Sequence, residues 1–285
     1  MAGDAAPAWY FPVREATYQM EAGLQRFGID FGNGEVDQQF FQIDREAARY
    51  EAAKAAVPKA RAGVLDRGDD EQSAHRTVLH WMRERLAAEH PGRVVASLPA
   101  NDFARDYADI AASIQEDFTV LYRNPSTGTE SAIAVFVALP TGWRPERILG
   151  ASFAQIHAPV PEFADDDLQS RSLVSSMIDR GPYVRFVWSV TADDGLDHHP
   201  EEGRRGDWRA DGRGWLRVER QVTVPFRAEH ASLFLIRVYL YPFEELPRAQ
   251  RRTLHEALGA MPPKIARYKG LHSDSRDIAR SLLLD

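Results

Sequence analysis

GWLRVERQVTVPF (residues 214–226) and ASLFLIRVYLYPF (residues 231–243) are neighbouring stretches rich in β-branched and aromatic residues. This composition, with the turn signals that bound each stretch, predicts two β-strands. Side chains alternate between the two faces of a strand, so Arg220 falls among apolar residues on one face and Arg217 falls on the other face. We therefore expect Arg220 to be buried and Arg217 to lie at the surface.

Three earlier stretches have the same character. They are FTVLYR (118–123), SAIAVFVALP (131–140) and YVRFVWSVTA (183–192). A long polar segment, residues 193–214, separates the last of these from the pair of strands that follows it. The sequence thus predicts about five strands in the middle and later parts of the chain.

Helix-forming sequence lies on both sides of these strands. Apolar residues at helical spacing or runs of helix formers predict helices within residues 44–65, 69–92, 104–118, 244–258 and 273–284. In the first stretch Asp44 is the expected N-cap and Pro58 an interruption. Helices, then strands, then helices are typical of an α+β fold built around an antiparallel sheet.

The composition limits the classes of function. The 285-residue chain has a net charge of −7, which does not indicate nucleic-acid binding. It contains no cysteine, which excludes disulfides, thiolate haem ligands and cysteine-bound iron–sulfur clusters. We see no signal peptide and no apolar stretch long enough for a membrane span, and expect a cytoplasmic protein. We expect residues 1–285 to form one domain, with residues 1–40 as an extended arm.

Three arginines share strand faces with apolar residues: Arg185, Arg220 and Arg237. A buried guanidinium requires an anionic or hydrogen-bonding partner, because an unpaired buried charge costs several kcal/mol. Each arginine therefore either forms an internal salt bridge or binds an external anion such as the carboxylates of a cofactor.

His157 is the histidine that the sequence singles out. It lies in SFAQIHAPVPEF (152–163), after an apolar run and before Pro159 and Pro161. The apolar neighbours predict that this segment packs inward. An inward histidine is either a hydrogen-bonded core residue or a ligand for a group held in the core.

Six motifs carry a resemblance to a known family. In order they are QEDFTVLYR, LPTGWRPERILGASFAQIHAPVPEF, VRFVWSV, RVERQ, LFLIRVYLYPF and RYKGL. Together they resemble the alpha subunit of the haem-dependent oxidative N-demethylases, which includes the haem subunit of dimethylamine monooxygenase. The resemblance implies a PAS-like antiparallel sheet that holds haem b. It also implies a monooxygenase that uses O₂ and two electrons to hydroxylate an N-methyl group, which then leaves as formaldehyde.

The resemblance also suggests residue roles. With no cysteine in the chain, His157 is the expected axial ligand of the haem iron. Arg185, Arg220 and Arg237 are expected to bind the haem propionates or to line the distal pocket. Arg220, Glu219 and Gln221 are the expected catalytic residues, although alternation separates Arg220 from the other two unless a bulge intervenes. Val187 and Tyr239 are expected to line the substrate pocket.

Two departures from the family pattern bear on the substrate. The family tends to carry an amide where this chain has Val187, and a Thr-Leu pair where this chain has Val222 and Thr223. A valine cannot hydrogen-bond a small polar amine, so we expect a larger, less polar amine-type substrate.

The electrons must come from elsewhere, because the chain has neither a dinucleotide-binding fingerprint nor cluster cysteines. We therefore expect a separate flavin or iron–sulfur reductase that draws on NAD(P)H. The alternative functions are a PAS-like haem or small-molecule sensor and a haem-free binding protein.

Overall fold

The computed structural model describes residues 5–14, 18, 23–30, 32–93, 102–161, 167–201, 206–208 and 212–284. Its centre is an antiparallel sheet of seven strands in the order β1-β5-β6-β7-β3-β4-β2. The strands are β1 (Gln25–Arg26), β2 (Ala62–Val64), β3 (Asp117–Arg123), β4 (Glu130–Phe136), β5 (Tyr183–Thr191), β6 (Trp215–Phe226) and β7 (Ala231–Pro242). The prediction of an α+β fold around an antiparallel sheet is confirmed.

The five predicted strands correspond to β3–β7, and two short strands were not predicted. β1 has two residues and pairs with β5, whereas β2 pairs with β4 at the other edge. Segments this short carry no periodicity that the sequence could reveal. β2 falls inside the stretch 44–65, after Pro58, where the sequence predicted helix with an interruption at that proline.

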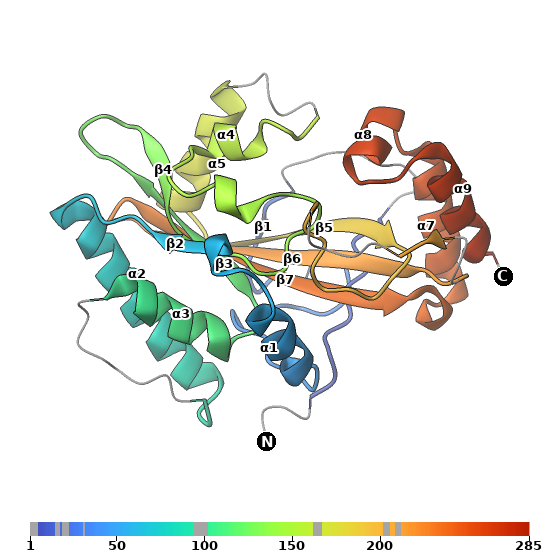
Figure 1. The fold of residues 1–285 in the computed structure, drawn as a ribbon, viewed down its shortest axis with the longest axis horizontal. Helices are drawn as coiled ribbons and strands as arrows, with labels where there is room; N and C mark the ends of the chain where they lie inside the picture. Colours follow the sequence, from blue (N-terminus) through green and yellow to red (C-terminus); the bar gives the residue numbers. More distant parts are fainter. Residues whose placement is uncertain are drawn as a thin grey trace.

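The α-helices form three groups around the sheet (Figure 1). They are α1 (Ala47–Ala55), α2 (Asp69–Glu89), α3 (Phe103–Ser113), α4 (Phe153–His157), α5 (Asp167–Asp179), α7 (Arg248–Ala260), α8 (Pro263–Tyr268) and α9 (Ser273–Leu282). α1–α3 lie on one face, α4 and α5 lie on the opposite face, and α7–α9 gather at one end of the sheet. None of the described helices is long and apolar enough to cross a membrane.

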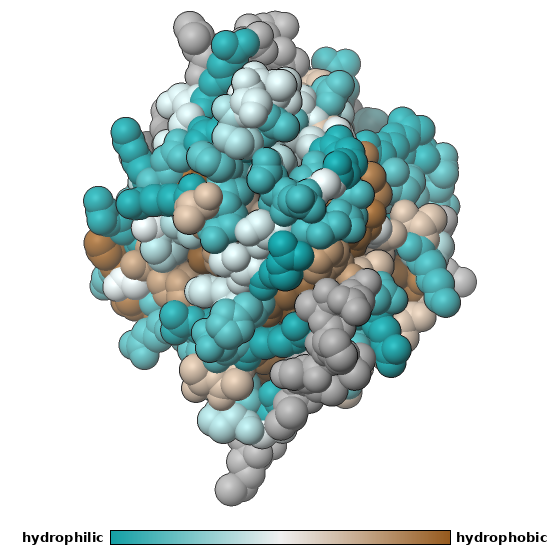
Figure 2. All heavy atoms as spheres, turned by 90° about the vertical axis from the view of Figure 1, so that its left-hand side faces the viewer, coloured by the Kyte–Doolittle hydropathy of each residue, from teal (hydrophilic) through white to brown (hydrophobic). Residues whose placement is uncertain are grey.

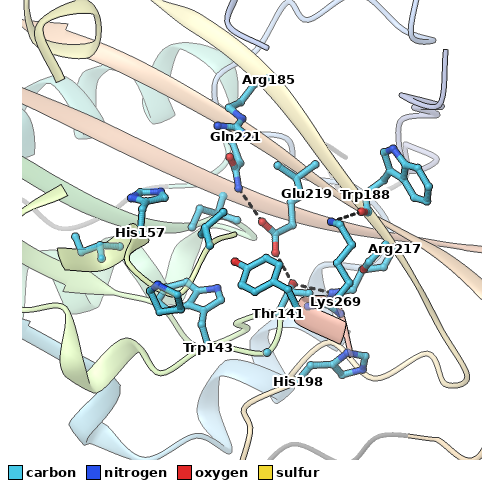
Figure 3. Close-up of a pocket in the computed structure, with 18 of the residues that line it drawn as sticks. Thr141, Trp143, His157, Arg185, Trp188, His198, Arg217, Glu219, Gln221 and Lys269 are labelled. Atoms are coloured by element: carbon cyan, nitrogen blue, oxygen red, sulfur yellow. Dashed lines mark hydrogen bonds between the residues drawn. The ribbon is translucent and has the colours of Figure 1, made fainter. Parts of the chain in front are cut away.

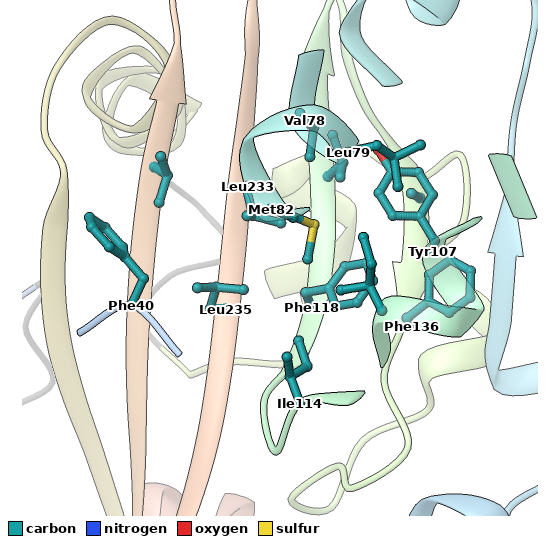
Figure 4. Close-up of a cluster of buried hydrophobic side chains, with 14 of the residues drawn as sticks. Phe40, Val78, Leu79, Met82, Tyr107, Ile114, Phe118, Phe136, Leu233 and Leu235 are labelled. Carbon is teal, nitrogen blue, oxygen red and sulfur yellow. The ribbon is translucent and has the colours of Figure 1, made fainter. Parts of the chain in front are cut away.

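The largest hydrophobic core lies between the sheet and the α2–α3 pair (Figure 4). Its fully buried members include Val78 and Met82 from α2, Tyr107 from α3, and Phe118 and Leu235 from the strands. Helical spacing in α2 and alternation in the strands bring these side chains to one interface. On the side shown in Figure 2, most of the surface is hydrophilic and apolar side chains appear mainly in the hollows.

A second core joins α7–α9 to the far ends of β5–β7. It includes Leu216, Val218 and Tyr241 from the strands and Leu254 and Leu258 from α7. The first core packs one face of the sheet, and the second packs its end. The remaining part of the sheet, on the face of α4 and α5, holds the cavity described below.

Candidate functional site

A cavity of about 1350 Å³ lies on the α4–α5 face of the sheet. Its walls include residues of β5–β7, of α4 and α5, and of the loop 141–151. His198, Pro200, Gly206 and Trp208 also line it, as do residues 268–271 at the end of α8. Pockets for drug-sized ligands measure about 300–1,000 Å³. The cavity therefore has room for a large ligand and a second, smaller molecule.

A row of polar side chains on β6 forms the floor of the cavity. Alternation sends Arg217, Glu219, Gln221 and Thr223 to this one face, and all four line the cavity. The first three are labelled in Figure 3. Apolar side chains of β7, such as Ile236, lie beside them. A central strand that buries a polar row is costly unless the row has partners or a ligand, so this row marks the site.

Glu219 is held by neutral donors. Gln221 Nε2 donates to Glu219 Oε2 at 2.8 Å, and the Thr141 hydroxyl donates to Oε1. Glu219 has no ion pair among the described residues. Its charge nevertheless raises the pKa values of Arg185, Arg217 and Lys269, against the effect of their burial. Its carboxylate therefore keeps lone pairs for a molecule in the cavity.

Arg185 faces the same cavity from β5, directly across from Gln221. Its Nε is buried and has no hydrogen-bond partner in the described structure. Burial lowers the pKa of the guanidinium, and the charge of Glu219 opposes that effect. A cation in this position calls for an anionic group supplied from outside the chain.

His157 is the last residue of α4 and also lines the cavity. The helix begins with a capping box in which Ser152 and Gln155 bond to each other's backbone N–H groups, a signal present in the sequence as S-x-x-Q. The His157 Nδ1–H donates to the Phe153 carbonyl at 2.9 Å, so Nε2 carries the lone pair. Burial lowers the pKa of the imidazole and the charge of Arg185 lowers it further, which favours the neutral, ligating form.

The structure does not bring Arg220, Arg237 and Tyr239 into the cavity. The register pairs Arg220 with Arg237 across β6 and β7, and no bulge interrupts it, so these residues lie on the opposite face from Glu219 and Gln221. Arg220 forms an ion pair with Asp37, and Arg237 pairs with Asp44 at 2.8 Å. Arg220 and Arg237 therefore form internal salt bridges and do not face the cavity, where the expected propionates would bind.

Tyr239 shares that opposite face and is also buried. Its hydroxyl donates to Gln42, and its ring lies 5.4 Å from the ring of Tyr10. The expectation that it lines the substrate pocket is corrected for the same reason of register. Val187, in contrast, lines the cavity directly across from Glu219.

Sequence reasoning assigned no role to three residues of the site. Arg217 was expected at the surface but is 1% exposed, because loops cover the second face of β6. Thr141 and Lys269 belong to two of the quoted motifs, LPTGWRPERILG and RYKGL, yet nothing in their spacing points to the cavity. Lys269 Nζ donates to the Trp188 carbonyl at 2.7 Å, and burial lowers its pKa to about 8.

The charge of the cavity is opposite to that of the protein. Glu219 is the one acidic side chain among the described lining residues. The basic ones are Arg14, Arg144, Arg147, Arg185, Arg217 and Lys269. In a chain of net charge −7 this arrangement favours an anionic occupant.

No group of three or more histidine, aspartate or glutamate side chains gathers as a metal site in the described part of the chain. His198 and His199 each bond a carboxylate instead, Asp193 and Glu146 respectively. A family model described as haem-dependent oxidative N-demethylase, alpha subunit-like, matches residues 36–278 of the chain.

Proposed function

The chain belongs to the haem-dependent oxidative N-demethylase, alpha subunit-like family, and from this premise we propose that it is a haem-dependent monooxygenase acting on an amine-type substrate. The overall reaction consumes O₂, two electrons and two protons, inserts one oxygen atom next to nitrogen and releases the other as water. An N-hydroxymethyl product then breaks down to the amine and formaldehyde. We further propose that residues 1–285 form one PAS-like haem-binding domain.

The cavity residues fit haem b. His157 presents a neutral imidazole whose Nε2 carries the lone pair that iron requires. Arg185 offers a guanidinium whose buried Nε has no hydrogen-bond acceptor in the described structure, which suits a propionate. When bound, haem b would supply the binding and reductive activation of dioxygen. The single observation that carries the proposal is the convergence of His157 and Arg185 on one cavity.

Glu219 and Gln221 would orient the substrate. The lone pairs of Glu219 that Thr141 and Gln221 leave unused can accept a hydrogen bond from a substrate nitrogen. Val187, which faces Glu219, contributes apolar surface. This combination favours an amine with a sizeable apolar body over dimethylamine.

Electrons would come from NAD(P)H through a separate flavin or iron–sulfur reductase, because the full sequence has no cluster cysteines and no dinucleotide fingerprint. A cytoplasmic location, where reduced nicotinamide is supplied, suits this route.

The test has two steps. Purified protein reconstituted with haem should show a Soret band and one haem per chain, and a protein without either would contradict the proposal. Turnover is then measured with a surrogate reductase, O₂ and a panel of N-methyl amines, following formaldehyde. Substrate-dependent formaldehyde release supports an enzyme. Haem binding without substrate-dependent O₂ use would instead indicate a sensor.

A further inference from the structure

Arg217 occupies an unusual place in the cavity wall. Its guanidinium is buried, yet it forms no direct ion pair among the described residues. It donates instead to the carbonyls of Gly195 at 3.0 Å and Leu196 at 2.8 Å, and its Nε donates to the Thr141 hydroxyl at 2.9 Å. A buried arginine that binds only neutral acceptors ties together the segments that carry them.

Those segments are two loops that close one end of the cavity. Thr141 and His198 form a parallel bridge, the Gly142 N–H donates to the His198 carbonyl at 3.0 Å, and the His198 N–H donates to the Pro140 carbonyl at 3.0 Å. Arg217 reaches across this junction to residues on both sides of it. The loop of Gly195 and Leu196 is thus fixed relative to β6 and to Thr141.

The hydroxyl of Thr141 has only one hydrogen to give. Because a guanidinium is always a donor, Thr141 Oγ1 must accept from Arg217 and direct its own hydrogen to Glu219 Oε1. A carboxylate can only accept, so the Thr141 hydroxyl gives its hydrogen to Glu219 while it receives one from Arg217, and this one hydroxyl links the two side chains. Gln221 holds the other carboxylate oxygen.

We propose that Arg217 and Thr141 are positioning residues that hold the Glu219 carboxylate toward the cavity and so determine where a substrate nitrogen binds. The consequence for Glu219 rests on the proposed function, but the arrangement itself does not require haem. The loop of Gly195 and Leu196 contributes to the same arrangement, because its carbonyls hold Arg217. If that loop moved, Arg217 would no longer be held against the Thr141 hydroxyl.

The experiment compares Thr141→Val, which keeps the shape of the side chain and removes the hydroxyl, with Thr141→Ser, which keeps the hydroxyl. Crystal structures of both variants report the position of Glu219, and calorimetry with benzyldimethylammonium as a cationic probe reports binding, on haem-free and haem-loaded protein. We expect Thr141→Val to displace the carboxylate and to weaken binding about 10- to 100-fold, the range for a lost bond to a charged group. Thr141→Ser should stay within about threefold of the unmodified protein.

Glu219→Gln supplies the second half of a double-mutant cycle. If Thr141 acts through Glu219, Thr141→Val should add no further loss in the Glu219→Gln background. Arg217→Lys, which keeps the charge but cannot reach all the acceptors, should reproduce part of the Thr141→Val effect. Equal losses in both backgrounds, or an undisplaced Glu219 in the Thr141→Val crystal structure, would overturn the inference. If the probe does not bind, the crystal structures alone decide. Failure to bind haem would contradict only the proposed function.

Discussion

Arg185 is a cation on the cavity face whose Nε lacks a hydrogen-bonded acceptor in the described structure. Replacing it with methionine should therefore have two effects of opposite sign. Haem affinity should fall about 10- to 100-fold, since a charge-assisted bond to a propionate is lost. The haem-free protein should become more stable by about 0.5–2 kcal/mol, because a poorly solvated charge is removed. Haem titration and urea unfolding measure the two quantities, and a stability loss in the haem-free protein would show that Arg185 has a structural partner.

Val187 adds apolar surface to the cavity, at a position where the resemblance led us to expect an amide. It faces Glu219 across β5 and β6. Val187→Asn should raise the kcat/KM ratio of dimethylamine to larger amines about two- to tenfold, the value of one neutral hydrogen bond. Val187→Leu is the control that keeps the surface apolar. Efficient dimethylamine turnover by the unmodified protein would show that the valine does not set the substrate size.

At the scale of the element, strand β6 shows what alternation can and cannot predict. Alternation correctly assigned Arg220 to a buried apolar face, but it treated the other face as solvent-exposed. Whether a second face is covered depends on loops far away in sequence, here those of Thr141 and Gly195, and no local pattern reports this. For this reason alternation alone did not predict that Arg217 and Glu219 lie in the wall of a cavity.

The two arginines of β6 should both matter for stability. Arg220→Ala leaves Asp37 buried and uncompensated, which should cost about 3–5 kcal/mol. Arg217→Ala leaves the carbonyls of Gly195 and Leu196 without a donor, at about 1–3 kcal/mol for each that water cannot reach. Arg252→Ala, in an exposed helix pair, should cost about 0–1 kcal/mol and serves as the control in urea unfolding. If the Arg217→Ala protein is as stable as the Arg252→Ala control, the buried hydrogen bonds of Arg217 do not contribute to stability, as expected of a surface residue.

The helices show a similar division between local and distant causes. Strong helical periodicity predicted α2, which ends, as expected, just before Pro91 and Gly92. The stretch 44–65 was predicted helical with an interruption at Pro58. α1 ends at Ala55, shortly before that proline, but the residues after it add β2 to the sheet edge instead of a second helical segment. Pairing with β4 outweighs the helix propensity of the later residues.

Lys269, in the segment after α8, should give the stability curve a pH dependence. Its pKa is about 8 in the folded protein and 10.5 in the reference state. Between these values the unfolded chain binds more protons, so stability contributed by this group rises with pH and is lowest below pH 8. Lys269→Met should therefore be more stable than the unmodified protein by about 1–3 kcal/mol below pH 8. The difference should vanish toward pH 10.5, and a pH-independent difference would exclude this titration.

At the scale of the whole molecule, the two cores and the cavity occupy separate parts of the sheet. The resemblance singled out His157, Arg185, Val187, Glu219 and Gln221, and all five line the cavity. The expectation was wrong for Arg220, Arg237 and Tyr239, which are buried on the opposite face of the sheet. There Arg220 pairs with Asp37 and Arg237 pairs with Asp44. A buried arginine looks the same in a sequence whether its partner is an aspartate of the chain or a bound anion.

The separation of core and cavity allows a final prediction about ligand removal. α4 contributes no fully buried residue, and neither main core contains His157. The haem-free His157→Ala protein should therefore remain folded, with a loss of stability that includes the bond to the Phe153 carbonyl and the contact between the two rings. Haem binding, in contrast, should be lost or greatly weakened, because no cysteine can replace the ligand. The Soret spectrum and haem stoichiometry are measured beside the urea midpoint of the haem-free variant. A retained wild-type Soret band would transfer the ligand role to another histidine, whereas an unfolded variant would show that α4 belongs to the core after all.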